Sequence, residues 1–283
     1  MLNQYNLALF KVHCAAVLFG LTGVLGAIIQ SSSEVLVFGR VLIAFVALSL
    51  FLLVKSQRII KLSTKDMLIQ AILGTMLISH WITFYIAIKV GGVAVGTLGF
   101  ASFPAFVALF EVLILKESIK RREIILLMAI TLGLALITPK YEFSNQATQG
   151  LLWGIFSGAI YGALAIFNRY NAEKLSGTQA SWWQYLAGAL VLAPYCLTEL
   201  PKVTAIDWFW IGCLGLLCTS LAYTIFISSL NIIKARTAAM IISLEPVYAI
   251  LIAWLWLDQV PTIRMIIGGL IILISVAIVN FRR

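Results

Sequence analysis

The chain has 283 residues, of which 62% are hydrophobic and only 11% are charged, and its mean hydropathy is +1.04. Soluble domains carry about a quarter charged residues, so this composition excludes an ordinary soluble protein and indicates a polytopic membrane protein. The net charge of +9 does not indicate nucleic-acid binding, because the basic residues lie in short connectors between apolar runs.

Ten apolar runs follow one another, separated by short polar breaks. Each run predicts one transmembrane helix, because crossing a hydrocarbon core of ~30 Å takes about 20 apolar residues. The predicted spans are 7–29, 34–54, 67–88, 93–115, 123–138, 149–168, 179–198, 206–229, 236–257 and 263–281. The start, "MLNQYNLALFK", lacks the charged region and cleavage site of a secretory signal, so the first run is expected to be retained as a span.

The basic residues predict the orientation of these spans. When alternate connectors are assigned to opposite sides, one side receives only Lys89, Lys140, Lys202 and Arg264. Arg40 lies inside the second span, and the other 15 Lys and Arg residues fall on the opposite side. Because positive charge is retained on the cytoplasmic side, both termini are predicted to be cytoplasmic.

Several other classes of protein lack support in the sequence. The four cysteines, Cys14, Cys196, Cys213 and Cys218, fall in apolar runs without C-x-x-C spacing, which argues against a disulfide framework and a metal site. The motifs H-E-x-x-H, G-x-S-x-G and G-x-x-x-x-G-K-[ST] are absent. We therefore expect no enzyme, no cofactor and no ATP hydrolysis by this chain.

The two halves of the sequence are related by a shift of 142 residues. The shift places Pro104 on Pro246, although the chain has only six prolines. It also pairs Gly20 with Gly162, Phe84 with Phe226, Leu109 with Leu251, Leu115 with Leu257, Arg122 with Arg264 and Ala135 with Ala277. Because each half holds five spans, the second half is predicted to be inverted, as in secondary transporters whose binding sites lie between the repeats.

Three segments give this repeat a family resemblance: "FGRVLIAFVAL", "FPAFVALFEVLILKESIKRREII" and its counterpart "EPVYAILIAWLWLDQVPTIRMIIGG". The halves, 1–140 and 149–283, resemble two EamA-type modules of the drug/metabolite transporter superfamily. The sequence departs from the family pattern at one position. The end of the proline-containing helix carries Glu117 in the first half but Gln259 in the second.

The resemblance implies metabolite transport, frequently export of amino acids or related compounds, across a bacterial cytoplasmic membrane. Together with the inverted repeat and the candidate residues below, it predicts a secondary transporter that exports amino acids or related amines and zwitterions by alternating access. The alternatives on the same fold are a lipid-linked sugar flippase and a sugar-phosphate or nucleotide-sugar carrier. Protons are the candidate coupling ion. The expected partners are a small-molecule substrate and the bilayer, without nucleic acid, and the chain is expected to be a monomer or a weak dimer.

Glu245 is the first candidate for the site, because the prediction places this acid near the middle of the ninth span. An ionisable residue there is costly and normally faces a cavity or a partner. Glu245 would therefore bind a substrate ammonium group or a proton, or else form a buried pair with Arg40 or His80.

Pro104 and Pro246 are the candidate hinges. A proline inside a helix leaves the carbonyl four residues earlier without its usual partner, here at Phe100 and Ile242. Such a carbonyl can bind substrate donors in a cavity; the alternative is a simple kink.

Aromatic residues of the third span make further candidates. Trp81 and Tyr85 share one helix face, and His80 lies on the adjoining one. An aromatic wall attracts ammonium groups, but these side chains could also only pack. His80 could shuttle protons or simply be a packing residue, and Arg40 could bind a carboxylate, or snorkel or pair with Glu34.

The sixth span places Gly150, Gly154, Gly158 and Gly162 on one stripe, which predicts close packing against another helix of the chain. Tyr161 and Asn168 lie off this stripe and could reach the cavity. Under the 142-residue shift Trp81 corresponds to Tyr223, and Phe103 corresponds to Glu245, so a site built from these residues would have an aromatic wall with one acid. The full set of predicted substrate-binding residues is Glu245, Trp81, Tyr85, His80, Phe103, Tyr223, Tyr248, Ser102, Ser243, Tyr161 and Arg40.

Overall fold

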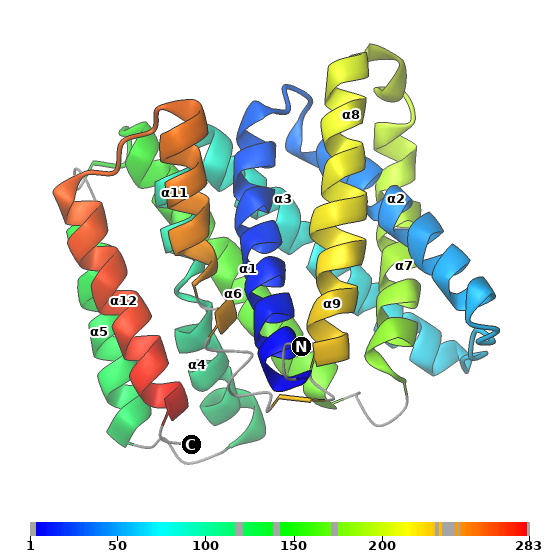
Figure 1. The fold of residues 1–283 in the computed structure, drawn as a ribbon, viewed down its shortest axis with the longest axis horizontal. Helices are drawn as coiled ribbons and strands as arrows, with labels where there is room; N and C mark the ends of the chain where they lie inside the picture. Colours follow the sequence, from blue (N-terminus) through cyan, green and yellow to red (C-terminus); the bar gives the residue numbers. More distant parts are fainter. Residues whose placement is uncertain are drawn as a thin grey trace.

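The computed structural model describes residues 4–116, 121–137, 142–170, 175–229, 232–233, 241–242 and 244–281, and these ranges contain helices but no strand. The long helices are α1 (Gln4–Ile28), α2 (Ser33–Val54), α3 (Thr64–Phe100), α4 (Phe103–Leu115), α5 (Arg121–Ile137), α6 (Gln146–Tyr170), α7 (Gly177–Cys196), α8 (Ala205–Cys213), α9 (Ala222–Ser229), α11 (Glu245–Leu257) and α12 (Ile263–Phe281). A 3₁₀ turn, η1 (Leu200–Lys202), precedes α8, and a π-helical segment, η2 (Leu214–Leu221), joins α8 to α9. Figure 1 shows the helices side by side in one bundle.

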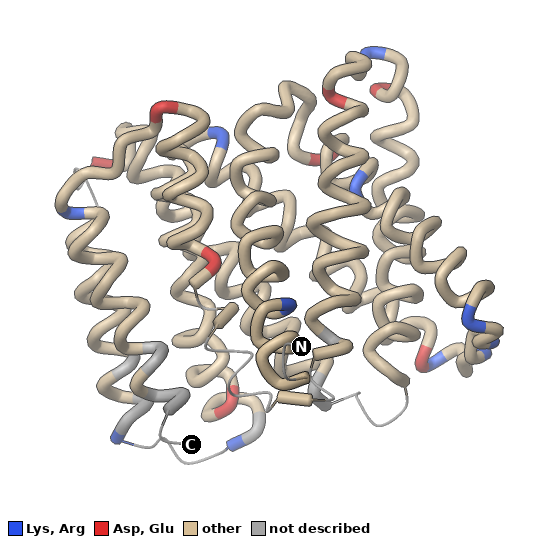
Figure 2. The backbone as a smooth tube through the Cα atoms, in the orientation of Figure 1, with Lys and Arg blue, Asp and Glu red and all other residues tan. Residues whose placement is uncertain are grey.

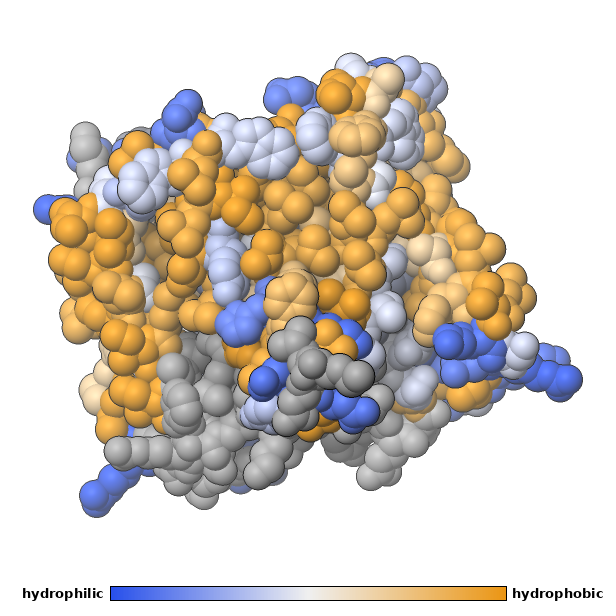
Figure 3. Space-filling view, in the orientation of Figure 1, coloured by the Kyte–Doolittle hydropathy of each residue, from blue (hydrophilic) through white to orange (hydrophobic). Residues whose placement is uncertain are grey.

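The surface of the bundle suits a lipid environment. Five described helices (α1, α2, α3, residues 146–168 of α6 and the α8–α9 run) are long and apolar enough to cross a membrane. Large apolar side chains stay exposed on the outside; Leu255 and Val54, for example, are each 83% exposed. Figure 3 shows this apolar surface as a broad band with hydrophilic residues along its upper edge.

Helix α3 contains the turn that separates the third and fourth predicted spans. Gly92 has a φ of +84°, and the chain folds back there, so that Gly96 packs against Ala87 and Ile88. A left-handed φ is accessible to glycine at little steric cost. The turn therefore lies between the predicted spans 67–88 and 93–115, although the two helices run almost without interruption.

The two prolines of the repeat begin helices instead of bending them. Pro104 and Pro246 lie in the first turns of α4 and α11, where a missing N–H removes no helical hydrogen bond. The prediction that Pro104 and Pro246 lie inside continuous helices is therefore wrong. The chain is interrupted just before each proline, at Ala101–Ser102 in the first half.

Helices α4 and α11 correspond in detail. Each has 13 residues, and each ends at a left-handed residue with a φ of 54°, Lys116 and Asp258, which are 142 positions apart. In Figure 1, α4 runs from the middle of the bundle to its lower side, whereas α11 runs from the middle to the upper side. The two helix N-termini therefore face the interior from opposite directions.

The glycine stripe of α6 packs within the chain as predicted. Gly150 lies against Gly91, and Gly154 lies against the backbone of Gly96 and Gly99. Further along, Gly162 meets the backbone of Val107 in α4. The absence of side chains allows these backbones to approach closely, which holds α6 against both parts of the interrupted span.

The same contact recurs in the other half. Gly20 of α1 lies against Tyr248 and the backbone of Ala249 in α11, just as Gly162 lies against Phe106 and Val107. All three positions are related by 142 residues. Helix α1 therefore packs on α11 as α6 packs on α4.

Gly154→Ala is expected to destabilise the protein by ~1–3 kcal/mol, the usual effect of overpacking a close contact. A β-carbon at Gly154 would lie 2.8 Å from the carbonyl oxygen of Gly96 and 3.1 Å from the α-carbon of Gly99, and backbone atoms cannot move aside easily. Thermal unfolding in detergent measures the effect. Gly212→Ala is the matched control, since a β-carbon there meets nothing within 4 Å; equal melting temperatures for the two variants would contradict the prediction.

Candidate functional site

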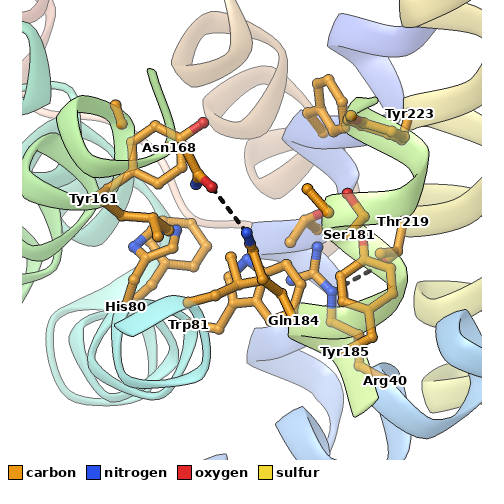
Figure 4. Close-up of a pocket in the computed structure, with 18 of the residues that line it drawn as sticks. Arg40, His80, Trp81, Tyr161, Asn168, Ser181, Gln184, Tyr185, Thr219 and Tyr223 are labelled. Atoms are coloured by element: carbon orange, nitrogen blue, oxygen red, sulfur yellow. Dashed lines mark hydrogen bonds between the residues drawn. The ribbon is translucent and has the colours of Figure 1, made fainter. Parts of the chain in front are cut away.

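A cavity of about 570 Å³ lies between the two halves of the chain. Its wall contains residues of α1, α2, α3, α6, α7, η2 and α9, together with the segment before α11 and the start of α11 itself. Arg40 and Glu245 are the charged residues among the described ones that line it. Figure 4 shows several of the polar and aromatic residues of the wall directed towards a shared space.

The wall reflects the repeat. Five pairs of residues that are 142 positions apart both line the cavity: Phe19 and Tyr161, Thr22 and Leu164, Leu77 and Thr219, Trp81 and Tyr223, and Phe100 and Ile242. The shift predicted the Trp81–Tyr223 pair; the structure adds the other four. Equivalent surfaces of the two halves therefore enclose one space, although the polar groups on them differ.

Arg40 is buried, with 4% of its surface exposed, and is held by three neighbours. Its Nε donates a hydrogen bond to the Thr219 hydroxyl (2.8 Å), and its Nη1 donates to the Tyr85 hydroxyl (2.8 Å). The guanidinium also lies 4.0 Å from the centre of the Trp81 ring, which is the geometry of a cation–π contact. The alternatives of snorkelling or pairing with Glu34 are wrong, because these contacts fix the side chain inside the bundle.

The π-helical segment η2 explains how Thr219 reaches Arg40. Thr219 donates its hydroxyl hydrogen to the carbonyl of Leu214, five residues earlier, which is the spacing of a π-helix. Its oxygen is then free to accept from Arg40. Short π-helical segments inside α-helices often lie at functional sites, and this one forms part of the cavity wall.

Glu245 is the first residue of α11 and lies half-buried in the cavity wall. The N-terminus of a helix favours a negative charge because its backbone N–H groups point outward. The guanidinium of Arg40 is hydrogen-bonded to Thr219 and Tyr85. The described side chains of Arg40 and Glu245 are opposite in charge and line the same cavity, but they do not form an ion pair with each other. The alternative interpretation, a buried salt bridge of Glu245 with Arg40 or His80, is therefore not what the described residues form.

His80 is tied to Ser157 of α6. The Ser157 hydroxyl donates to the backbone carbonyl of His80 (2.9 Å) and lies 2.7 Å from its Nδ1. Because this hydroxyl has only one hydrogen, Nδ1 is the donor in the second contact. The ring also packs against Phe84, Phe100 and Tyr161. His80 therefore joins α3 to α6, and it also lines the cavity.

The remaining predicted residues lie at different distances from the cavity. Tyr85 lies behind Arg40, and Phe103 stacks on Phe100, whose ring lines the wall. Ser102 donates to the carbonyl of Gly99 at the helix interruption. Tyr248 is directed away and contacts the ring of His13 through its hydroxyl (3.0 Å). Ser243 lies outside the described residues.

Sequence reasoning missed a set of polar residues in the wall: Gln70, Ser181, Gln184, Tyr185 and Thr219. Amide side chains inside apolar spans were the available signal, because a buried amide requires partners. Glu111 of α4 is a buried acid, 8% exposed, but it does not line the cavity.

The cavity reaches the surface at one end of the bundle. Gly177, the first residue of α7, is exposed and lines the cavity. Nearby, Gln179 is hydrogen-bonded to the backbone of Arg58 and Ile60, in the connector 55–63 between α2 and α3. We call this side the basic end, since the connector carries Lys55, Arg58 and Lys61; Figure 2 shows it as a group of Lys and Arg residues.

The opposite end, called the Asp207 end, is closed by hydrogen bonds between segments. The Asp207 carboxylate accepts from the backbone N–H groups of Gln30 and Ser31 and from the Ser31 hydroxyl. Lys89 donates to the carbonyls of Ile29 and Ser31. These bonds fix the connector between α1 and α2 against α8 and α3.

A second link at the Asp207 end joins the two halves. The side-chain oxygen of Gln259 accepts from the backbone N–H of Val93, directly after the turn at Gly92. Gln259 thus has a structural contact at the position where the first half carries Glu117, which lies outside the described residues.

The chain matches a known family over almost its whole length. A model of the EamA-like transporter family matches residues 6–138 and again residues 148–281. The chain belongs to the EamA-like transporter family. This confirms the resemblance noted in the sequence and the broad interpretation as a membrane transporter.

Relatives of this EamA-like transporter carry equally general names. "Uncharacterized transporter YxxF" of Bacillus subtilis is 22% identical over 99% of this chain and 92% of its own length. An "uncharacterized transporter" of Archaeoglobus fulgidus is 27% identical over 69% of this chain and 70% of its own. A solved structure entitled "Crystal structure of protein" has a TM-score of 0.66 and 16% identity, and the match covers 98% of this chain and 96% of that one, which shows a shared fold.

Ser157→Ala in this EamA-like transporter is expected to lower the free energy of unfolding by ~1–3 kcal/mol, because it leaves the buried Nδ1–H of His80 without an acceptor. Thermal unfolding in detergent measures the loss. Ser228→Ala is the control, since the exposed Ser228 hydroxyl donates to the carbonyl of Ile225 in its own helix. A wild-type melting temperature for Ser157→Ala would show that the Ser157 contact does not hold His80 in place.

Proposed function

We propose that this protein is a secondary transporter that exports amino acids or related amines and zwitterions across a bacterial cytoplasmic membrane. It crosses the membrane ten times, as two inverted five-helix repeats with both termini in the cytoplasm. Membership of the EamA-like transporter family supports the general activity. The substrate class rests on the cavity.

The separation of Arg40 and Glu245 is the observation that carries the substrate class. A carboxylate can pair with the Arg40 guanidinium, and an ammonium group can pair with Glu245, because neither described side chain forms an ion pair with the other. The rings of Trp81, Tyr161 and Tyr223 lie in the same wall and favour cations and apolar groups. A small zwitterion satisfies all of these groups together.

Phosphate-bearing substrates have less support. Recognition of a phosphate commonly uses several donors of positive charge, with arginine in bidentate contact. Among the described residues of the wall Arg40 is the one cation, and it already donates to Thr219 and Tyr85. A sugar-phosphate or nucleotide-sugar carrier would need further cations in this cavity.

Alternating access is supported by the difference between the two ends. The cavity reaches the surface beside the connector 55–63, whereas hydrogen bonds of Asp207, Lys89 and Gln259 hold the other end together. Positive charge marks the cytoplasmic side of membrane proteins, so in this proposal the basic end faces the cytoplasm and the described conformation corresponds to an inward-open state. Substrate would leave after the bonds at the Asp207 end open, and protons are the candidate coupling ion.

Glu245→Gln and Arg40→Gln are each expected to weaken zwitterion binding by at least tenfold. Each removes one charge-assisted contact, and hydrogen bonds to charged groups contribute about 1.5–3 kcal/mol. The measurement is a thermal-shift titration of the purified protein with the twenty amino acids and common amines, because a ligand of the native state raises the melting temperature with concentration. Transport of the ligand that binds most tightly is then measured in proteoliposomes.

Glu199→Gln and Arg58→Gln are the matched controls, since both lie outside the cavity on the surface. They should bind as the wild type does. The two cavity variants should also differ in which ligands they bind weakly. Glu245→Gln should leave the affinity unchanged for a ligand that lacks the ammonium group, and Arg40→Gln should leave it unchanged for a ligand that lacks the carboxylate. If both cavity variants bind and transport zwitterions normally, the proposed site is wrong.

Asp207→Ala is expected to favour opening at the Asp207 end, because it removes the acceptor of three hydrogen bonds. The measurement is the labelling rate of Cys218, which lines the cavity, by a membrane-impermeant thiol reagent added from outside. The variant should keep Cys218 as its one cysteine. Labelling should be faster in Asp207→Ala than in Glu199→Gln, a partly exposed acid that pairs with Lys202 near the same end; equal rates would contradict a gating role for Asp207.

A further inference from the structure

Three amide side chains from three helices meet in the cavity wall: Gln70 of α3, Asn168 of α6 and Gln184 of α7. We call them the amide cluster. The Gln184 Nε2 donates to the Gln70 Oε1 (3.0 Å) and to the Asn168 Oδ1 (2.8 Å). Figure 4 shows Gln184 reaching towards Asn168, with Tyr161 and His80 on one side and Ser181 and Tyr185 on the other.

These two bonds leave part of the cluster without a partner. An amide nitrogen carries two hydrogens, so Gln184 uses both of its donors. The Gln184 Oε1 and the amide nitrogens of Gln70 and Asn168 have no hydrogen-bond partner among the described residues. Gln70 and Gln184 are each only 5% exposed, and a buried polar group without a partner is unfavourable.

Another glutamine of α7 shows how a purely structural amide looks in this protein. Gln179 is also 5% exposed, but its Oε1 accepts from the N–H of Ile60 and its Nε2 donates to the carbonyl of Arg58. Both of its polar groups are bonded to the chain, and Gln179 does not line the cavity. The amide cluster, in contrast, lines the cavity and keeps polar groups without a hydrogen-bond partner among the described residues.

We propose that the amide cluster is a second subsite of the cavity, which binds an uncharged hydrogen-bonding side chain of the substrate. The free nitrogens of Gln70 and Asn168 donate to an oxygen, and the free oxygen of Gln184 accepts from an N–H or O–H group. A carboxamide offers both kinds of group and fits best; a hydroxyl offers them on one atom. The inference rests on the proposed function, whose Arg40 and Glu245 bind the carboxylate and the ammonium group.

The cluster and Arg40 lie on different helices of one cavity wall. A substrate that reaches both carries its hydrogen-bonding group at the end of its side chain. Glutamine has such a side chain with a terminal carboxamide, whereas methionine has similar length and volume but cannot form these hydrogen bonds.

The experiment compares the binding of glutamine and methionine to the full-length protein by thermal-shift titration. The wild type should bind glutamine about tenfold more tightly, since one or two uncharged hydrogen bonds provide roughly that factor. Gln184→Met and, separately, Asn168→Leu should bring the ratio of the two affinities close to one while methionine binds as before. Gln149→Met is the matched control, because this exposed amide of α6 bonds to Phe143 outside the cavity; its ratio should equal that of the wild type.

Each contrary result has its own meaning. If no zwitterion raises the melting temperature of the wild type, the proposed function fails and this inference fails with it. If zwitterions bind and depend on Arg40 and Glu245, but the wild type binds methionine as tightly as glutamine, only the subsite is overturned. A preference for glutamine that survives in both cavity variants would show that the cluster only joins helices. The wild-type comparison holds even if a variant does not fold.

Discussion

The buried guanidinium of Arg40 is the interaction around which the interior of this protein is organised. A charge inside the bilayer is costly unless partners within the protein surround it. Thr219, Tyr85 and Trp81 supply those partners from two separate regions of the chain. Since Arg40 is hydrogen-bonded to Thr219 and Tyr85 and forms no salt bridge with Glu245, the bundle keeps two described side chains of opposite charge in one cavity wall, and the proposed zwitterion site rests on this arrangement.

The interrupted helices place the second charge. Proline at the first turn of α11 makes a new helix begin at Glu245, so that the carboxylate lies at a helix N-terminus in the cavity wall. In the other half α4 begins in the same way, but Phe103 takes the corresponding position and stacks on Phe100. The symmetric backbone thus provides two inward-facing helix ends, and the side chains make only one of them acidic.

Close backbone packing gives the halves firm surfaces. Glycines of α6 and α1 bring these helices against α4 and α11, so each interrupted helix rests on a continuous neighbour. The hydrogen bonds at the Asp207 end are polar and join different elements of the chain. In the proposed alternating access, opening of that end would break a few polar bonds, while the apolar packing within each half persists.

The sequence by itself determined the features that depend on composition and local pattern. Mean hydropathy indicated a membrane protein, and the glycine spacing in 150–162 predicted close packing of that helix. The 142-residue shift predicted that Pro104 and Pro246 are equivalent and that Trp81 and Tyr223 share a wall. These features are visible because helix geometry and burial in lipid restrict which residue types can occur at which spacing.

Only the tertiary structure decided which polar groups meet. Nothing in the local sequence separates Gln179, which is bonded to the chain, from Gln184, which faces the cavity. Likewise, Tyr248 was expected in the site but turns to His13, and Arg40 contacts Thr219, which lies 179 residues away. Such pairings depend on the rotation and depth of separate helices, which long-range packing sets and no periodicity within one helix encodes.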